Sequence, residues 1–282
     1  MPTPANAIAV TTPGAVSFDG TLFHGGILSG ANGGTGTANT NLTLDLITSP
    51  GEGKVMTSDI EGNGTWQSGG GSGFTSIVVQ VFTDTALYTV TEGTRYALLE
   101  VVGGGGGGGD APAVSESEIS VGGGGSAGGY ARKLVDSAAL GPSQTITIGA
   151  AAGPMENGVT TSIGVLCVAN GGLAGLSGES ANSSVASGVI GGGAPTGDVK
   201  VQGGGGGAGF ATTSLFMAVS GTGGASFYGP GALAVVVGDA QDVPGIDGVS
   251  YGSGGSGAIS GANGPTSGGS GAKGYAVVTE FI

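Results

Sequence analysis

Few side chains in this sequence are of the types that carry out acid–base or nucleophilic chemistry. The single histidine, His24, lies in Phe23-His-Gly-Gly26, a pattern typical of a turn, and we identify no Ser-His-Asp arrangement around it. The single cysteine, Cys167, lies in an apolar stretch and is expected to be a small buried hydrophobic residue. We therefore predict no catalytic residues and no enzyme activity.

Metal and nucleotide sites are equally poorly supported. Asp239, Asp242 and Asp247 lie among glycine and proline, but they lack the ordered oxygen ligands of a calcium loop. A structural role is expected for them, with a weak divalent site as the alternative. The spacing Gly-x-Gly-x-x-Gly occurs within 103–109 only because that run is all glycine, and no helix pattern follows it. No metal and no cofactor are predicted.

Charge restricts the possible partners. The chain has 6 basic and 19 acidic residues and a net charge of −13. Nucleic-acid binding depends on Lys and Arg at the phosphates, so neither nucleic acid nor an anionic membrane surface is an expected partner. No stretch of about 20 apolar residues predicts a membrane span.

Glycine supplies 68 of the 282 residues, yet only 9% are charged and mean hydropathy is +0.29. A disordered chain would be polar and charged, so the glycine is expected to be ordered. Runs such as 103–109 and 203–207 can form extended helices with three residues per turn, which have no internal hydrogen bonds. Packed side by side, such helices can bond to one another through their peptide groups.

Strand-like segments lead into these runs, at 77–82, 86–90, 95–102, 128–135, 144–149 and 161–169 and at the C-terminus. Helical periodicity is almost absent. We predict a mainly β fold with polyglycine-II-like helices, sandwich-like and with little α-helix. Segments 173–190 and 210–251 contain less glycine, which leaves open whether they complete the lattice of glycine helices.

A composition change divides the chain. Residues 1–73 contain short strand patterns, among them Asn41–Ile47, and end in the Gly/Ser-rich segment 68–73. We predict an N-terminal fibre or attachment segment over 1–73 and a glycine-rich C-terminal domain over 74–282. A segment of this length is only marginally stable as an independent fold. We therefore expect three chains to assemble as a homotrimer, with a monomeric cap bound to another fibre as the alternative.

Residues 74–282 resemble the glycine-rich domain at the ends of bacteriophage tail fibres. The N-terminal segment also contains pieces that resemble repeats of phage fibre proteins. The residues that carry the resemblance are Ala97-Leu-Leu-Glu-Val-Val-Gly103, Gly128-Gly-Tyr-Ala-Arg-Lys-Leu-Val135, Pro142-Ser-Gln-Thr-Ile-Thr-Ile-Gly-Ala150, Gly271-Ala-Lys-Gly-Tyr-Ala-Val-Val-Thr-Glu-Phe281, Gly33–Thr40 and Val55–Gln67.

The resemblance implies a virion protein in the tail fibre that recognises a host receptor through loops and contacts other tail proteins through its N-terminal segment. Three other hypotheses remain open. One is a purely structural virion component, such as a head fibre or a tail spacer. Another is an ice-binding or coat protein, although the regular threonine face that it needs is missing. The third is a depolymerase acting through paired carboxylates.

Receptor contacts are expected in loops, because lattice backbone is already occupied. The candidate loops are 110–121, 173–190, 210–230 and 239–251, and the candidate contact residues are Glu116, Glu118, Phe227, Tyr228 and Tyr251. Phe210 and Phe216 are expected instead to fill the edges of the slab. Because the chain is acidic, an outer-membrane protein or a neutral glycan suits it better as receptor than a phosphate-rich lipopolysaccharide core.

Overall fold

The structure, a computed structural model, describes residues 9–12, 15–17, 54–58, 64–68 and 75–282, except 116, 215, 216, 240 and 263. The chain divides into two compact units, Met1–Gly73 and Phe74–Ile282. In the first unit, β1 (Ala9–Thr12) pairs with β2 (Ala15–Ser17), and β3 (Lys54–Ser58) pairs with β4 (Gly64–Ser68). The predicted strand at Asn41–Ile47 and His24 lie outside the described residues.

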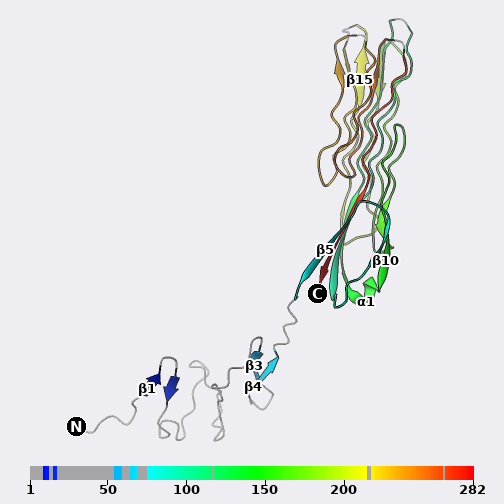
Figure 1. The fold of residues 1–282 in the computed structure, drawn as a ribbon. Helices are drawn as coiled ribbons and strands as arrows, with labels where there is room; N and C mark the ends of the chain where they lie inside the picture. Colours follow the sequence, from blue (N-terminus) through cyan, green and yellow to red (C-terminus); the bar gives the residue numbers. More distant parts are fainter. Residues whose placement is uncertain are drawn as a thin grey trace, which may run out of the picture. The chain divides into compact units, whose positions relative to one another are not determined.

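One end of the second unit, which we call the base, consists of two antiparallel sheets (Figure 1). Their facing sides enclose the main apolar core, which includes Tyr88, Leu99, Ile146 and Val278. One sheet has the order β14-β9-β7-β19-β5 and the other the order β12-β11-β10-β6. Their bounds are β5 (Ile77–Phe82), β6 (Ala86–Thr89), β7 (Tyr96–Val102), β9 (Tyr130–Asp136), β10 (Ser143–Thr147), β11 (Thr161–Ile163), β12 (Cys167–Ala169), β14 (Val199–Val201) and β19 (Tyr275–Phe281).

Secondary structure follows the predicted pattern closely. Of the residues that the structure describes, strands make up 36% and helix 2%, which confirms a mainly β fold with little helix. The segment 161–169, predicted as one strand, is instead the hairpin β11–β12, which turns at Gly164 with a φ of +50°. The short helix α1 (Ser137–Leu140) begins at Asp136, whose carboxylate accepts the Ala139 N–H at 2.7 Å.

Strand β7 leads directly into the glycine run 103–109, whose peptide groups bond only to other segments. Successive N–H groups point to three different neighbours, and each neighbour recurs every third residue. This is the geometry of a helix with three residues per turn. Gly103, Gly106 and Gly109 donate to the carbonyls of Gly129, Ser126 and Gly123; Gly104 and Gly107 donate to Val159 and Glu156; Gly105 and Gly108 donate to Ala272 and Gly269.

The run 122–129 repeats this arrangement with other neighbours, so the two runs are the centre of a laterally bonded lattice of glycine helices. Both runs are buried along their whole length. The predicted polyglycine-II-like helices are therefore present. Gly122, Gly125 and Gly128 donate to Ala258, Gly255 and Gly252; Gly123, Ser126 and Gly129 donate to Leu176, Leu173 and Asn170; Gly124 and Ala127 donate to Gly207 and Gly204.

Close packing explains why the central runs are glycine. A Cβ atom on Gly105 would lie 1.9 Å from the carbonyl oxygen of Ser253, and one on Gly108 would lie 1.8 Å from that of Ser256. Runs at the periphery have an open side, and there every third residue can carry an exposed side chain, as Leu173 and Leu176 do. Segments 173–176, 188–193, 221–225 and 244–249 are such lattice runs, which explains their lower glycine content.

At the other end of the lattice, which we call the distal end, the chain turns back through short strands (Figure 1). A small second core there contains Ile119, Val121, Ala211, Val237 and Ile259. The strands are β8 (Ser120–Val121) paired with β18 (Ile259–Ser260), and the sheet β13-β15-β16-β17, formed by β13 (Ser183–Ala186), β15 (Gly209–Thr212), β16 (Met217–Val219) and β17 (Val236–Val237).

A buried carboxylate ties the base together. Glu280 on β19 is fully buried and accepts the Tyr88 hydroxyl at 2.6 Å and both the N–H and the hydroxyl of Thr91, at 2.8 and 2.6 Å. Burial alone would raise the pKa of Glu280, but these donors, with Gln80, hold its pKa below the ordinary value. The hydrogen bonds in the base therefore stabilise the ionised form of Glu280.

The packing of the central run predicts a sharp difference between two glycine-to-alanine substitutions. Gly108→Ala is expected to lower the free energy of unfolding by roughly 4 kcal/mol or more, or to prevent folding, because its Cβ meets backbone that cannot move independently. Gly193→Ala, where nothing lies within 4 Å of the added Cβ, is the matched control and should stay within about 1 kcal/mol of the parent. Urea denaturation measures both, and equal tolerance at the two positions would contradict the lattice packing.

The Glu280 network predicts a pH-dependent contribution to stability. Because the folded-state pKa is depressed, the stabilisation is present above the ordinary glutamate pKa and is lost as pH falls through the folded value. At pH 7, Glu280→Gln should therefore lower the free energy of unfolding by about 2–4 kcal/mol relative to the parent, since buried donors lose their acceptor. The difference should shrink at pH 3. The exposed Glu92→Gln is the control, and a Glu280→Gln deficit that does not change with pH would argue against an ionised Glu280.

Candidate functional site

The distal end collects five loop segments that are far apart in the sequence. Bridges between Ala111 and Thr266, between Ile119 and Ala181 and between Val243 and Ile259 link them into one surface. The predicted loop 110–121 lies here, between two lattice runs as expected. The other three predicted loops are only partly loops, because each includes lattice runs. The segments at the distal end are 110–121, 177–187, 209–220, 236–244 and 259–267.

The acidic residues of this end mainly hold its turns in place. Asp242 accepts the backbone N–H groups of Gly261, Ala262 and Gly264 at 3.0, 2.8 and 3.1 Å. Burial acts to raise the pKa of Asp242, but these three donors hold it below its usual value. Asp247, which the sequence groups with Asp239 and Asp242, lies instead on the lattice run 244–249 and accepts the Ser270 N–H at 2.6 Å. Among the described residues, no group of three or more His, Cys, Asp or Glu is placed to hold a metal ion.

Glu118 is the one predicted contact residue that the structure describes at the distal end. Its carboxylate accepts the Ser180 hydroxyl at 2.7 Å and the Ser115 N–H at 3.3 Å, and these donors lower its pKa. Glu118 therefore joins loop 110–121 to loop 177–187. Glu116 lies outside the described residues.

The three aromatic candidates lie elsewhere, in the turns 226–229 and 250–252 where the lattice meets the base. Phe227 stacks on Tyr130 with ring centroids 3.8 Å apart, and Tyr251 stacks on Tyr275 at 4.5 Å. Tyr228 meets Tyr275 edge to face at 5.3 Å. Since Tyr130 and Tyr275 begin β9 and β19, this aromatic cluster packs against the base. The four predicted contact residues that the structure describes, Glu118, Phe227, Tyr228 and Tyr251, thus do not form one surface.

The distal sheet instead presents an apolar row that the sequence analysis did not select. Val185, Phe210 and Val219 stand opposite one another on β13, β15 and β16, and Val219 stands opposite Val236 on β17. Val185 is 61% exposed, Phe210 46% and Val236 64%. Their strand neighbours Ala211, Ala218 and Val237 face the distal core. Phe210 was expected to fill a slab edge, but its side chain is exposed on β15, and Gly209-Phe-Ala-Thr212 has no apolar–polar alternation that would signal this. Phe216 lies outside the described residues.

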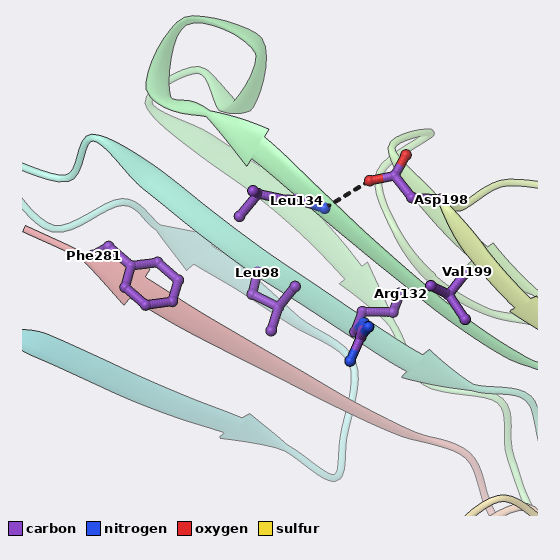
Figure 2. A pocket seen from close by; sticks show the side chains of 6 residues that line it. All are labelled: Leu98, Arg132, Leu134, Asp198, Val199 and Phe281. Carbon is purple, nitrogen blue, oxygen red and sulfur yellow. Dashed lines mark hydrogen bonds between the residues drawn. The ribbon is translucent and has the colours of Figure 1, made fainter.

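A second exposed apolar surface covers the outer side of the five-stranded sheet at the base, and we call it the outer sheet face. A cavity of about 380 Å³ opens on it, lined by Leu98, Arg132, Leu134, Asp198, Val199 and Phe281 (Figure 2). Leu98 and Phe281 come from the adjacent strands β7 and β19, and the Leu134 N–H donates to the Asp198 carboxylate at 3.0 Å. The run Ile77-Val-Val-Gln-Val-Phe82 already signals this surface, because it is apolar at both strand faces.

Cys167 is buried within the base, as predicted. Burial raises the pKa of its thiol to about 12. A thiol of this kind is protonated at neutral pH and a poor nucleophile. In the part of the chain that the structure describes, no helix has the length and apolar character needed to cross a membrane.

Comparison with known proteins identifies the second unit. A search among curated proteins finds no match. The family model described as a glycine-rich domain matches residues 80–280, which include the lattice, the distal loops and both sheets of the base except the start of β5 and the last residue of β19. The chain therefore belongs to the glycine-rich domain family.

Proposed function

We propose that this protein is a virion fibre protein, a tail fibre that mediates adsorption by binding a host-cell receptor through its distal loops. The observation that carries the proposal is the separation of the two ends of the second unit. The chain enters this unit at β5 in the base, whereas the five loop segments gather at the opposite end of the lattice (Figure 1). A rigid support with variable loops at its far end is a common arrangement for recognition.

The lattice supplies the rigidity. Its peptide groups bond laterally in several directions, so no single run can bend without breaking bonds to its neighbours. The loops above it are joined to each other by backbone bridges and by the side chains of Glu118 and Asp242. Such a surface is pre-organised, which lowers the entropy lost on binding.

The chemistry of the distal end supports a protein or a neutral glycan as the receptor. All lysines and arginines of the second unit lie in the base or beside it, whereas the distal loops carry acidic residues. This charge distribution disfavours a phosphate-rich ligand. The apolar row around Phe210, bordered by the hydroxyls of Thr212 and Ser214, can pack on an apolar patch or on the face of a sugar ring.

We further propose that residues 1–73 attach the protein to other tail proteins and assemble it as a homotrimer. A segment of this length buries too little surface to be stable alone, and neighbouring chains can supply the missing core. Three-fold cyclic assembly suits a fibre.

The proposal predicts that the apolar row is needed for binding to cells. Labelled full-length protein is tested against a panel of bacterial strains, and a strain that the parent binds is used to compare variants. Phe210→Ala combined with Val185→Ala should weaken binding at least 10-fold, because the row loses most of its apolar contact area. Leu233→Ala, which alters a 73% exposed side chain on a lattice run, is the control.

Two further variants separate the distal end from the aromatic cluster. Tyr228→Ala and Tyr251→Ala alter side chains near the base and should leave binding within about two-fold of the parent. If the parent binds no strain, or if the Phe210 variant binds as the parent does while a shortened loop 110–121 also has no effect, the receptor-binding proposal fails. A purely structural virion component then becomes the better account.

A further inference from the structure

We propose that the outer sheet face is covered by a second copy of this chain, in a contact between the bases of neighbouring protomers. The face consists of the alternate residues of β5, β19, β7 and β9 that point away from the core. On β5 the exposed fractions are 59% for Ile77, 58% for Val79 and 53% for Val81. On β9, Leu134 is 53% exposed.

These side chains form a continuous surface because the strand register aligns them. Val79 stands opposite Thr279, Thr279 opposite Leu98, and Leu98 opposite Leu134. One row of the sheet is thus apolar over most of its width. The inner face of the same sheet already carries the main core, so the sheet is apolar on both sides. Sheets of this kind are normally covered on both faces.

The face combines a ridge with a depression. The ridge is the edge strand β5, with its three exposed β-branched residues. The depression is the cavity between Leu98, Leu134 and Val199, near the opposite edge of the sheet (Figure 2). The ridge of one copy can therefore enter the depression of the next. A contact that joins two different parts of the surface closes into a ring when the rotation between copies allows it. A ring of three copies fits the trimer proposed above, and the inference relies on that proposal only for the copy number.

Charge favours this face over the rest of the surface for self-association. The protein has a net charge of −13, so most contacts between two copies are repulsive. At the centre of the outer sheet face, Glu100 stands directly opposite Arg132, and their charges have opposite sign. Asp198 adds one negative charge at the edge of the face, where its carboxylate accepts the Leu134 N–H, so a contact here brings few like charges together.

The area is sufficient for a specific contact. Five strands about 4.8 Å apart and about six residues long at roughly 3.3 Å per residue cover on the order of 500 Å². Three copies that each bury this face in a closed ring remove roughly 1,500 Å² from solvent, which is in the range of specific assemblies. A second copy also brings the same apolar composition, and no further ligand is needed to account for the exposed side chains.

The first test is the mass of the full-length protein in solution, measured by light scattering. The parent should have roughly three times the mass of the 26.2 kDa chain. Val79→Lys should make the assembly dissociate on dilution at concentrations where the parent stays assembled, because it places a buried charge in the contact. Val249→Lys, at a 79% exposed lattice position, is the control and should keep the parental mass. Thermal unfolding of both variants verifies that they fold.

The second test uses thiol labelling, which does not require the assembly to come apart. Cys167 is buried and silent, so a cysteine introduced by Val79→Cys is the reactive thiol. In the assembled protein it should react with a maleimide at least 100-fold more slowly than the cysteine of the control Val249→Cys. Equal rates would overturn the inference, as would a multimer whose dissociation on dilution Val79→Lys leaves unchanged.

A monomeric parent overturns the inference even if the Val79→Cys thiol is protected, because no second copy is then present to cover the face. A multimer of another copy number that Val79→Lys disperses supports the inference while contradicting the trimer. Loss of cell binding by Phe210→Ala without any change in mass separates the receptor-binding proposal from this one.

Discussion

Lateral hydrogen bonding between peptide chains that lack side chains is the constraint on which this structure depends. An α-helix or a β-strand directs its backbone bonds along one axis or within one plane. A glycine helix with three residues per turn directs them in three directions, and each can reach a different neighbour. The central runs 103–109 and 122–129 use this freedom fully. Ser126 and Ala127 carry the only side chains in these two runs, and at every glycine of the runs an added Cβ atom would lie within 2.8 Å of a neighbouring carbonyl oxygen.

A lattice of this kind has little apolar core of its own, and that determines the organisation of both ends. At the base, two sheets bury Tyr88, Leu99 and Ile146 between them, and the buried carboxylate of Glu280 on one sheet accepts the hydroxyl of Tyr88 on the other. At the distal end, a smaller core holds the short strands together. The loops can vary in sequence there without disturbing the lattice. The separation between regular backbone packing in the lattice and chemically varied loops at its end is what makes a recognition role physically reasonable.

Much of the fold could be predicted from the sequence, because the signals were local. The strands at 77–82 and 95–102, the ordered glycine runs and the near absence of helix follow from composition and alternation. The glycine-poor segments could not be assigned to the lattice from composition, because a peripheral lattice run needs glycine only on its buried sides. Segments 173–176 and 244–249 therefore read as loops.

The position of the aromatic candidates could not be predicted for a related reason. Phe227, Tyr228 and Tyr251 follow Gly-rich segments, and the sequence does not reveal which end of the lattice each turn occupies. Each lattice run carries the chain from one end of the lattice to the other. The end that a turn occupies therefore depends on how many runs precede it. Pairing across strands was also hidden, so neither the apolar row at Phe210 nor the width of the outer sheet face could be recognised before Val185 and Leu134 were placed beside their partners.

The central claim is that the glycine runs are ordered by bonds to their neighbours, and amide hydrogen exchange tests it directly. In the full-length protein, the amides of 103–109 and 122–129 should exchange about as slowly as those of β7, because each donates to a buried carbonyl. Exchange of these glycine amides at the rate of a free glycine peptide, with β7 still protected, would contradict the lattice and the account built on it.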